Sequence, residues 1–229
     1  MSRIGGVWKV QWREWRGFVY QPWLTLFSVF VVTQALFSVV SSSDEMEFNG
    51  AAFILFVYGF VYSIVLVAQS FPLLIGLSVS RKDFFYGTAS VLIASSLLNG
   101  AIFSFLSGME RITGYWWHDF RFFDYPYLTE GSYFPRLVVL SLLLMAYQMF
   151  GFFLGCLHRR FKSRGVWLFF IITGLVYLAA SYVPEVRHLG NDIIEWGTGR
   201  TAFELSLLLL PLIVLLAACS RLLIRRANA

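Results

Sequence analysis

Charged residues are scarce in this chain of 229 residues, where Asp, Glu, Lys and Arg together make up 14%. Hydrophobic residues make up 58%, and the mean hydropathy is +0.69. In a soluble protein, the net charge of +5 would point to nucleic acid. In so apolar a chain we expect no nucleic-acid partner, and we attribute the basic excess to contact with anionic membrane lipid.

The chain also lacks the motifs that carry common enzyme chemistry. It has no G-x-x-x-x-G-K-[ST] loop for ATP phosphates, no H-E-x-x-H and no G-x-S-x-G. His118, His158 and His188 fall in three different loops, so we predict no metal site. Cys156 and Cys219 lie at the cytoplasmic ends of apolar runs, where a structural disulfide does not form. We therefore expect no catalytic residue and no cofactor bound by this chain.

What the chain has is a series of apolar runs, each about as long as a bilayer is thick. They cover residues 22–41, 51–77, 88–109, 134–157, 166–183 and 201–220. A helix needs roughly 20 apolar residues to cross the hydrocarbon core. The sequence therefore predicts six transmembrane helices. The run 22–41 is longer than the apolar part of a signal peptide, and we interpret it as a span.

Basic and acidic residues alternate between the gaps that separate these runs. Most of the basic residues lie at the chain ends or in alternate gaps, namely Arg3, Lys9, Arg13, Arg16, Arg81, Lys82, Arg159, Arg160, Lys162, Arg164, Arg221, Arg225 and Arg226. The intervening gaps hold most of the acids, namely Asp44, Glu45, Glu47, Glu110, Asp119, Asp124, Glu130, Glu185, Asp192 and Glu195. Because Lys and Arg mark the cytoplasmic side, we predict an all-α membrane protein with both termini cytoplasmic. It forms a single domain, with an interfacial helix over 1–21, six spans over 22–221 and a tail over 222–229.

The first twenty residues have the pattern of an amphipathic helix lying on the membrane surface. Three tryptophans share one helical face and three cations form a neighbouring stripe: Trp8, Trp12 and Trp15, and Lys9, Arg13 and Arg16. Indole rings favour the membrane interface, and basic side chains reach the lipid headgroups. The alternative is a tryptophan belt that anchors only the first span.

Residues inside the spans point mainly to helix packing. Gly151 and Gly155 form a small-xxx-small pair that allows another helix to approach closely. Uncharged polar side chains at membrane depth predict interhelical hydrogen bonds, or alternatively the lining of a path: Gln34, Gln69, Asn99 and Gln148. The spans hold no central acid–base pair, which argues against a proton- or ion-coupled carrier.

The segment 71–88, which joins the second and third predicted spans, is the most informative part of the chain. Ser80 is placed to cap a helix whose first turn holds Asp83. Phe84 and Phe85 follow, and Gly87 is expected to interrupt the helix before the third span begins at Thr88.

This link resembles that of the membrane subunits of type-2 ATP-binding-cassette (ABC) transporters, in particular small permeases of Gram-positive bacteria. The family pattern Gly-x-Ser-x-Ser-Arg-Lys-Asp-Phe-Phe-x-Gly is matched by Gly76, Ser78, Ser80, Arg81, Lys82, Asp83, Phe84, Phe85 and Gly87. The resemblance implies that residues 80–85 and the N-terminal helix contact a separate ATPase subunit, which carries ATP and Mg²⁺. It also implies a second permease, identical or different, and short re-entrant helices over 184–199. The alternative is a basic loop that only sets topology.

The outer loop 110–134 is rich in aromatic residues and longer than in the plainest members of that family. One interpretation is a folded outer cap or an interfacial aromatic belt. The sharper alternative is an aromatic gate for an apolar cargo, formed by Tyr115, Trp116, Trp117 and Phe120.

Together these features predict a multi-pass permease of the cell membrane. By its resemblance to the ABC permeases, it would export a substrate with energy from ATP that another chain hydrolyses. Its partners would be an ABC ATPase, a second permease and membrane lipids. A non-transport scaffold or sensor is the main alternative, and a membrane-embedded lipid enzyme is a weaker one, since no acid–base cluster is visible.

Overall fold

The computed structural model describes residues 5–8, 10–11, 19–40, 50–115, 121–129, 131–183, 186, 188, 192 and 195–226. Its longer regular elements are all helical: α2 (Gln21–Val40), η2 (Gly50–Phe53), α3 (Ile54–Gly76), α4 (Arg81–Ile112), α5 (Tyr133–Tyr182), α7 (Ala202–Leu207) and α8 (Leu209–Arg225). No strand occurs within these described ranges. The predicted all-α class is confirmed.

Four helical segments are long and apolar enough to cross a membrane: α3, α4, α5 and the continuous run of α7 and α8 over 202–225. The apolar part of α2, over 21–36, is shorter. The predicted first span coincides with α2, and the predicted fourth and fifth spans both lie inside α5. The chain is thus a membrane protein by helix length and composition, and the count of six spans stays a prediction.

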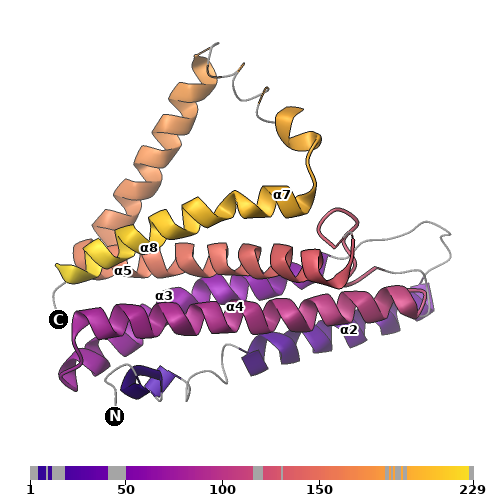
Figure 1. Ribbon diagram of the computed structural model, residues 1–229, viewed down its shortest axis with the longest axis horizontal. Coiled ribbons are helices and arrows are strands. Elements are labelled where there is room, and N and C mark those ends of the chain that lie inside the picture. Colours follow the sequence, from indigo (N-terminus) through magenta and orange to yellow (C-terminus); the bar gives the residue numbers. More distant parts are fainter. Residues whose placement is uncertain are drawn as a thin grey trace.

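The helix α5 has 50 residues, which is about 75 Å of α-helix and more than twice the hydrocarbon thickness. Its one non-helical residue is Lys162, at φ 57° and ψ −159°. Figure 1 shows that the orange part of α5 beyond this point leaves the bundle at a steep angle. Lys162 thus divides α5 where the sequence predicts a cytoplasmic turn.

The first part of α5 packs closely against α3, at the two predicted glycines. A Cβ on Gly151 would overlap the backbone oxygen of Phe60, and one on Gly155 would lie 3.0 Å from Cβ of Val67. The absence of side chains at these positions allows the two backbones to approach. The predicted small-xxx-small contact is confirmed.

Polar side chains of α4 make hydrogen bonds to neighbouring helices midway along the bundle. The hydroxyl of Ser95 donates to Oε1 of Gln148 on α5 (2.9 Å). The indole N–H of Trp23 on α2 donates to Oδ1 of Asn99 (2.7 Å). The interhelical role predicted for Asn99 and Gln148 is therefore confirmed. Gln69 is exposed, whereas the buried amide of Gln34 has no hydrogen-bond partner within the described part of the chain.

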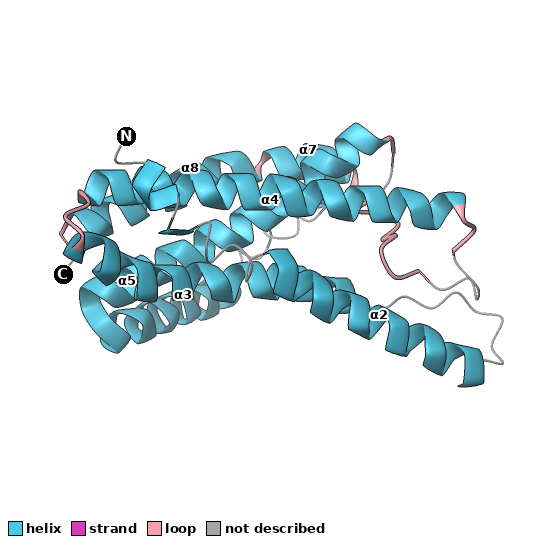
Figure 2. Cartoon of the chain, turned by 90° about the horizontal axis from the view of Figure 1, so that it is seen from below, coloured by secondary structure: helices cyan, strands magenta, loops and turns pink. Residues whose placement is uncertain are grey.

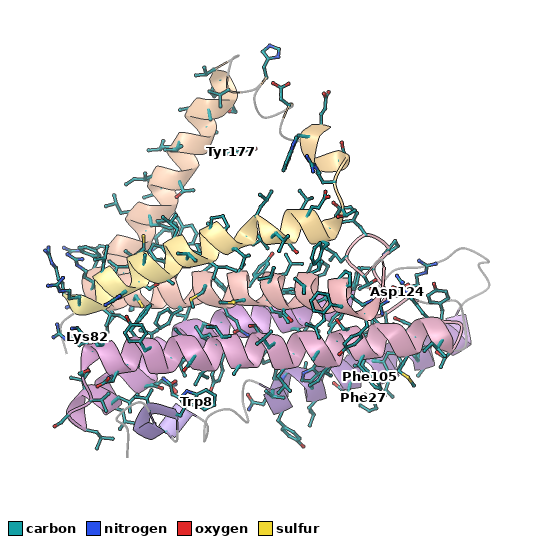
Figure 3. The ribbon with its side chains drawn as sticks, in the orientation of Figure 1. Trp8, Phe27, Lys82, Phe105, Asp124 and Tyr177 are labelled. Atoms are coloured by element: carbon teal, nitrogen blue, oxygen red, sulfur yellow. The ribbon has the colours of Figure 1, made fainter. Side chains whose placement is uncertain are left out.

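Two apolar clusters lie towards opposite ends of this bundle. One contains Phe71, Phe84 and Phe152, and the other contains Phe103 and Phe122. Figure 3 places Lys82 near the first end and Asp124 near the second. Figure 2, seen from below, shows α2 diverging from α4 towards the second end. The bundle therefore has an end with Lys82, called here the basic end, and an end with Asp124, called here the outer end after the topology that the sequence predicts.

Candidate functional site

The link between α3 and α4 has the helix cap that the sequence predicts. Ser80 adopts an extended backbone, and its hydroxyl oxygen accepts the backbone N–H of Asp83 at 3.1 Å. The same hydroxyl donates to Oδ2 of Asp83 at 2.7 Å. Upstream, α3 ends at Gly76, and Ser78 turns the chain with φ 61°. This geometry fixes Arg81 as the first residue of α4.

The expected interruption of the helix at Gly87 is wrong, because α4 runs without a break from Arg81 to Ile112. A glycine inside a helix costs only about 1 kcal/mol relative to alanine, and here packing offsets that cost. A Cβ on Gly87 would lie 2.6 Å from Cγ1 of the buried Val7. Gly87 thus makes room for the N-terminal segment, and the link is the start of a long helix.

The phenylalanine pair of the link is buried within this chain. Phe84 is 0% exposed and makes an edge-to-face contact with Phe71 of α3, with ring centroids 5.1 Å apart. Phe85 is 7% exposed, and its ring centroid lies 6.1 Å from that of Phe152 on α5. Both rings therefore anchor α4 to its own bundle. The exposed side chains of the link include Leu77, Lys82 and Tyr86, and Arg81 is partly exposed.

The N-terminal segment lies against the beginning of α4. The indole N–H of Trp8 donates to the hydroxyl of Ser90 (2.8 Å), and the side-chain amide of Gln11 donates to the hydroxyl of Thr88 (2.8 Å). Figure 3 shows Trp8 below α4 at the basic end. Trp8 and Gln11 thus hold this segment beside the link. The rest of the predicted amphipathic stripe lies outside the described residues: Lys9, Trp12, Arg13, Trp15 and Arg16.

The C-terminal helix α8 reaches the same end. The Nη1 group of Arg81 donates to the backbone carbonyl of Arg225 at 2.8 Å, and the guanidinium of Arg221 lies 5.3 Å from the ring centroid of Tyr86. A cavity of about 770 Å³ lies between the two helix ends. It is lined by Ser80, Arg81, Lys82, Phe85, Ala218, Arg221, Leu222, Ile224 and Arg225. This basic cavity was not predicted, although Arg221 and Arg225 have the spacing that places two cations on one helical face.

At the outer end, Glu110 fastens the loop that follows α4. The carboxylate is 0% exposed, and it accepts the backbone N–H groups of Phe122, Phe123 and Asp124, each at 2.7 Å. The buried carboxylate of Asp124 accepts from Nε of Arg111 at 2.8 Å. Sequence analysis did not single out Glu110. An acid at the end of a span is ordinarily expected at the membrane interface.

The described part of the outer loop is folded onto the bundle. Phe122 and Phe123 are buried, and the ring centroid of Phe122 lies 5.1 Å from that of Phe30 on α2. Residues 121–129 therefore form a folded cap. Of the predicted gate residues, Tyr115 lies beside Arg121, whose guanidinium carbon is 4.4 Å from the centroid of the tyrosine ring. Trp116, Trp117 and Phe120 lie outside the described residues.

Within the described ranges, no group of three or more His, Cys, Asp or Glu residues is arranged to hold a metal ion. The predicted re-entrant segment 184–199 lies largely outside those ranges, and residues 195–198 are helical. No family model, curated protein or solved structure matches this chain. Any function must therefore be argued from the geometry of the two ends.

Proposed function

We propose that this chain is the permease subunit of an ABC exporter of the cell membrane, which pairs with a second permease and is driven by a separate ATPase. The observation that carries the proposal is the capped start of α4 at the basic end. Ser80 fixes where the helix begins, and the N-terminal segment and α8 meet it there through Trp8 and Arg81. Three parts of the chain thus form one surface on which a soluble partner can dock.

The contact with the ATPase would be made by the accessible side chains of this surface, not by the phenylalanine pair. Lys82 and Tyr86 are exposed, whereas Phe84 and Phe85 are packed inside. Aromatic residues are enriched at interface hot spots, so Tyr86 supplies the main apolar contact. Lys82 and Arg81 set the register and the rate of association more than the affinity.

The helix α4 supplies a direct mechanical route from this surface to the outer cap. Its 32 residues correspond to about 48 Å of continuous helix. Phe84 couples its first turn to α3, and Glu110 couples its last turns to the cap. A displacement imposed at Lys82 would therefore move α4 as a rigid body. Packed helices transmit conformational change in this way.

The proposal is tested by what the membrane protein brings with it on purification in mild detergent. We expect a Walker-type ATPase, at a ratio consistent with two permeases and two ATPase chains. The double variant Lys82→Glu/Tyr86→Ala removes accessible side chains only, and should lower ATPase recovery per permease by about tenfold or more. The matched control Lys162→Glu/Trp167→Ala likewise changes one lysine and one aromatic residue, at exposed positions of α5, and should leave recovery unchanged. Recovery of a monomer without ATPase, with transport intact in nanodiscs, would refute the proposal.

A sensor or scaffold is the second candidate, and one feature of the outer end favours it. A cavity of about 380 Å³ lies between the cap, α5 and α7, lined by Tyr127, Leu128, Gly131, Pro135, Val139, Thr201, Ala202 and Phe203. The hydroxyl of Tyr127 donates to the carbonyl of Arg200 at 3.0 Å and ties the cap to the segment before α7. Capture of an outer ligand without any associated ATPase would favour this candidate.

A further inference from the structure

We propose that the basic cavity between α4 and α8 is a binding site for one anionic phospholipid, whose headgroup phosphate lies among Arg81, Lys82, Arg221 and Arg225. The proposal requires only that the chain crosses a membrane, and it does not depend on the transport function. Basic pockets between transmembrane helices are typical sites for anionic lipid headgroups.

Within the described part of the chain, no acidic side chain lines the cavity to neutralise its charge. Four of its nine lining residues are cations, and none is an acid. The nearest acid in sequence, Asp83, does not line the cavity and accepts a hydrogen bond from Ser80. In the described part of the chain, none of these four cations forms an ion pair; pairs such as Arg111–Asp124 and Arg200–Glu204 lie away from this end. An anion is therefore the ligand that these four side chains favour.

The walls of the cavity and the surface that continues it are apolar, which distinguishes a lipid from a free phosphate ion. Phe85, Leu222 and Ile224 supply the large apolar side chains of the lining, and Ala218 and the polar Ser80 complete it. Tyr86 of α4 and Arg221 of α8 face each other. On each helix, residues about two helical turns away from these positions lie on the same face. On α4 this face carries the exposed Ile93 and Leu97, and on α8 it carries the exposed Val214 and Leu210. These apolar side chains form two rows, one on each helix, and an acyl chain can lie along them.

The size of the cavity fits this occupant. A volume of about 770 Å³ lies within the range of small-molecule sites, about 300–1,000 Å³. It exceeds by far the volume of a phosphate ion. The cavity also lies at a suitable depth, because it is at the ends of α4 and α8. When the apolar faces of these helices lie among the acyl chains, their ends lie at the level of the lipid headgroups.

The test uses the purified full chain, with any subunit that accompanies it, titrated with short-chain phosphatidylglycerol and followed by native mass spectrometry. The variant Arg221→Gln/Arg225→Gln removes two exposed cations of the cavity. Each cation near anionic lipid is worth roughly a factor of five, so affinity should fall roughly thirtyfold. Arg221→Lys/Arg225→Lys should retain it. The control Lys162→Gln/Arg164→Gln loses the same charge from exposed positions outside the cavity, and should change affinity by less than about twofold.

Three results would overturn the lipid site. An equal loss in the cavity variant and the control would mean diffuse surface attraction. Competition by inorganic phosphate at the concentrations at which the lipid binds would mean a site for a free anion. Unchanged lipid binding with reduced ATPase recovery in the Arg221/Arg225 variant would mean that the cavity receives an acidic segment of a protein partner. Binding of phosphatidylglycerol but not phosphatidylcholine, lost only in the cavity variant, supports the proposal.

Discussion

The substitution Glu110→Gln should release the outer cap from the bundle. Oε2 of Glu110 accepts the N–H groups of Phe123 and Asp124, and Oε1 accepts that of Phe122. In glutamine one of the two oxygens becomes an NH₂ group. At least one backbone N–H then faces a donor instead of an acceptor, and the remaining bonds lose the assistance of the negative charge.

The magnitude follows from these three bonds. A hydrogen bond to a charged group contributes about 1.5–3 kcal/mol, whereas a neutral one contributes about 1 kcal/mol. Loss of one charged bond and weakening of two others amounts to about 3–5 kcal/mol. Because 1.4 kcal/mol is a factor of ten, the population of the open cap should rise by about two to three and a half orders of magnitude.

The measurement is amide hydrogen exchange at Phe122, Phe123 and Asp124 in nanodiscs, with amides in the middle of α3 as an internal reference. Glu204→Gln is the matched control, since Glu204 is half exposed and pairs with Arg200 at 3.6 Å. An exposed pair of this kind contributes at most about 1 kcal/mol. If exchange of the three amides in Glu110→Gln stays within threefold of the parent, the carboxylate does not hold the cap.

Three further predictions concern the bundle. Gly151→Ala should destabilise the protein by about 1–3 kcal/mol because its Cβ would overlap the carbonyl of Phe60; Gly174→Ala, on the exposed part of α5, should be neutral or slightly stabilising, and equal melting of the two variants would contradict the close contact. Phe84→Ala should lower the free energy of unfolding by about 3–5 kcal/mol, and Tyr86→Ala should lower it little, as measured by thermal unfolding in detergent. The reverse order would place Phe84 at the surface. Cysteines at Lys82 and Lys162 should resist an impermeant thiol reagent in intact cells while Tyr127→Cys reacts, in a background without Cys156 and Cys219; the opposite pattern would invert the topology.

Features that depend on neighbours in sequence were predicted well. Ser80 and Asp83 are three residues apart, and their reciprocal hydrogen bonds form within one turn. Gly151 and Gly155 lie on one helical face, so their use as a close-packing surface follows from spacing alone. Hydrophobic run length likewise predicted helices at the positions of α3, α4 and α8.

Features that depend on distant segments were not predictable in this way. Phe84 and Phe85 were expected at a partner surface, but Phe71 and Phe152 cover them. Gly87 was expected to break a helix, but the approach of Val7 makes its lack of a side chain useful there. The basic cavity joins Arg81 to Arg225, which are 144 positions apart, and no local pattern reveals such a pairing.

The two ends of α4 are held in different ways, and this difference bears on the proposed mechanism. At the outer end, a buried carboxylate accepts three backbone N–H groups and so holds the cap to α4. At the basic end, Lys82 and Tyr86 remain accessible beside a cavity without acids. A partner can therefore bind and release the basic end without unfolding it, while the helix between transmits its position. In the proposed permease, an outer opening would require the hydrogen bonds of Glu110 to break.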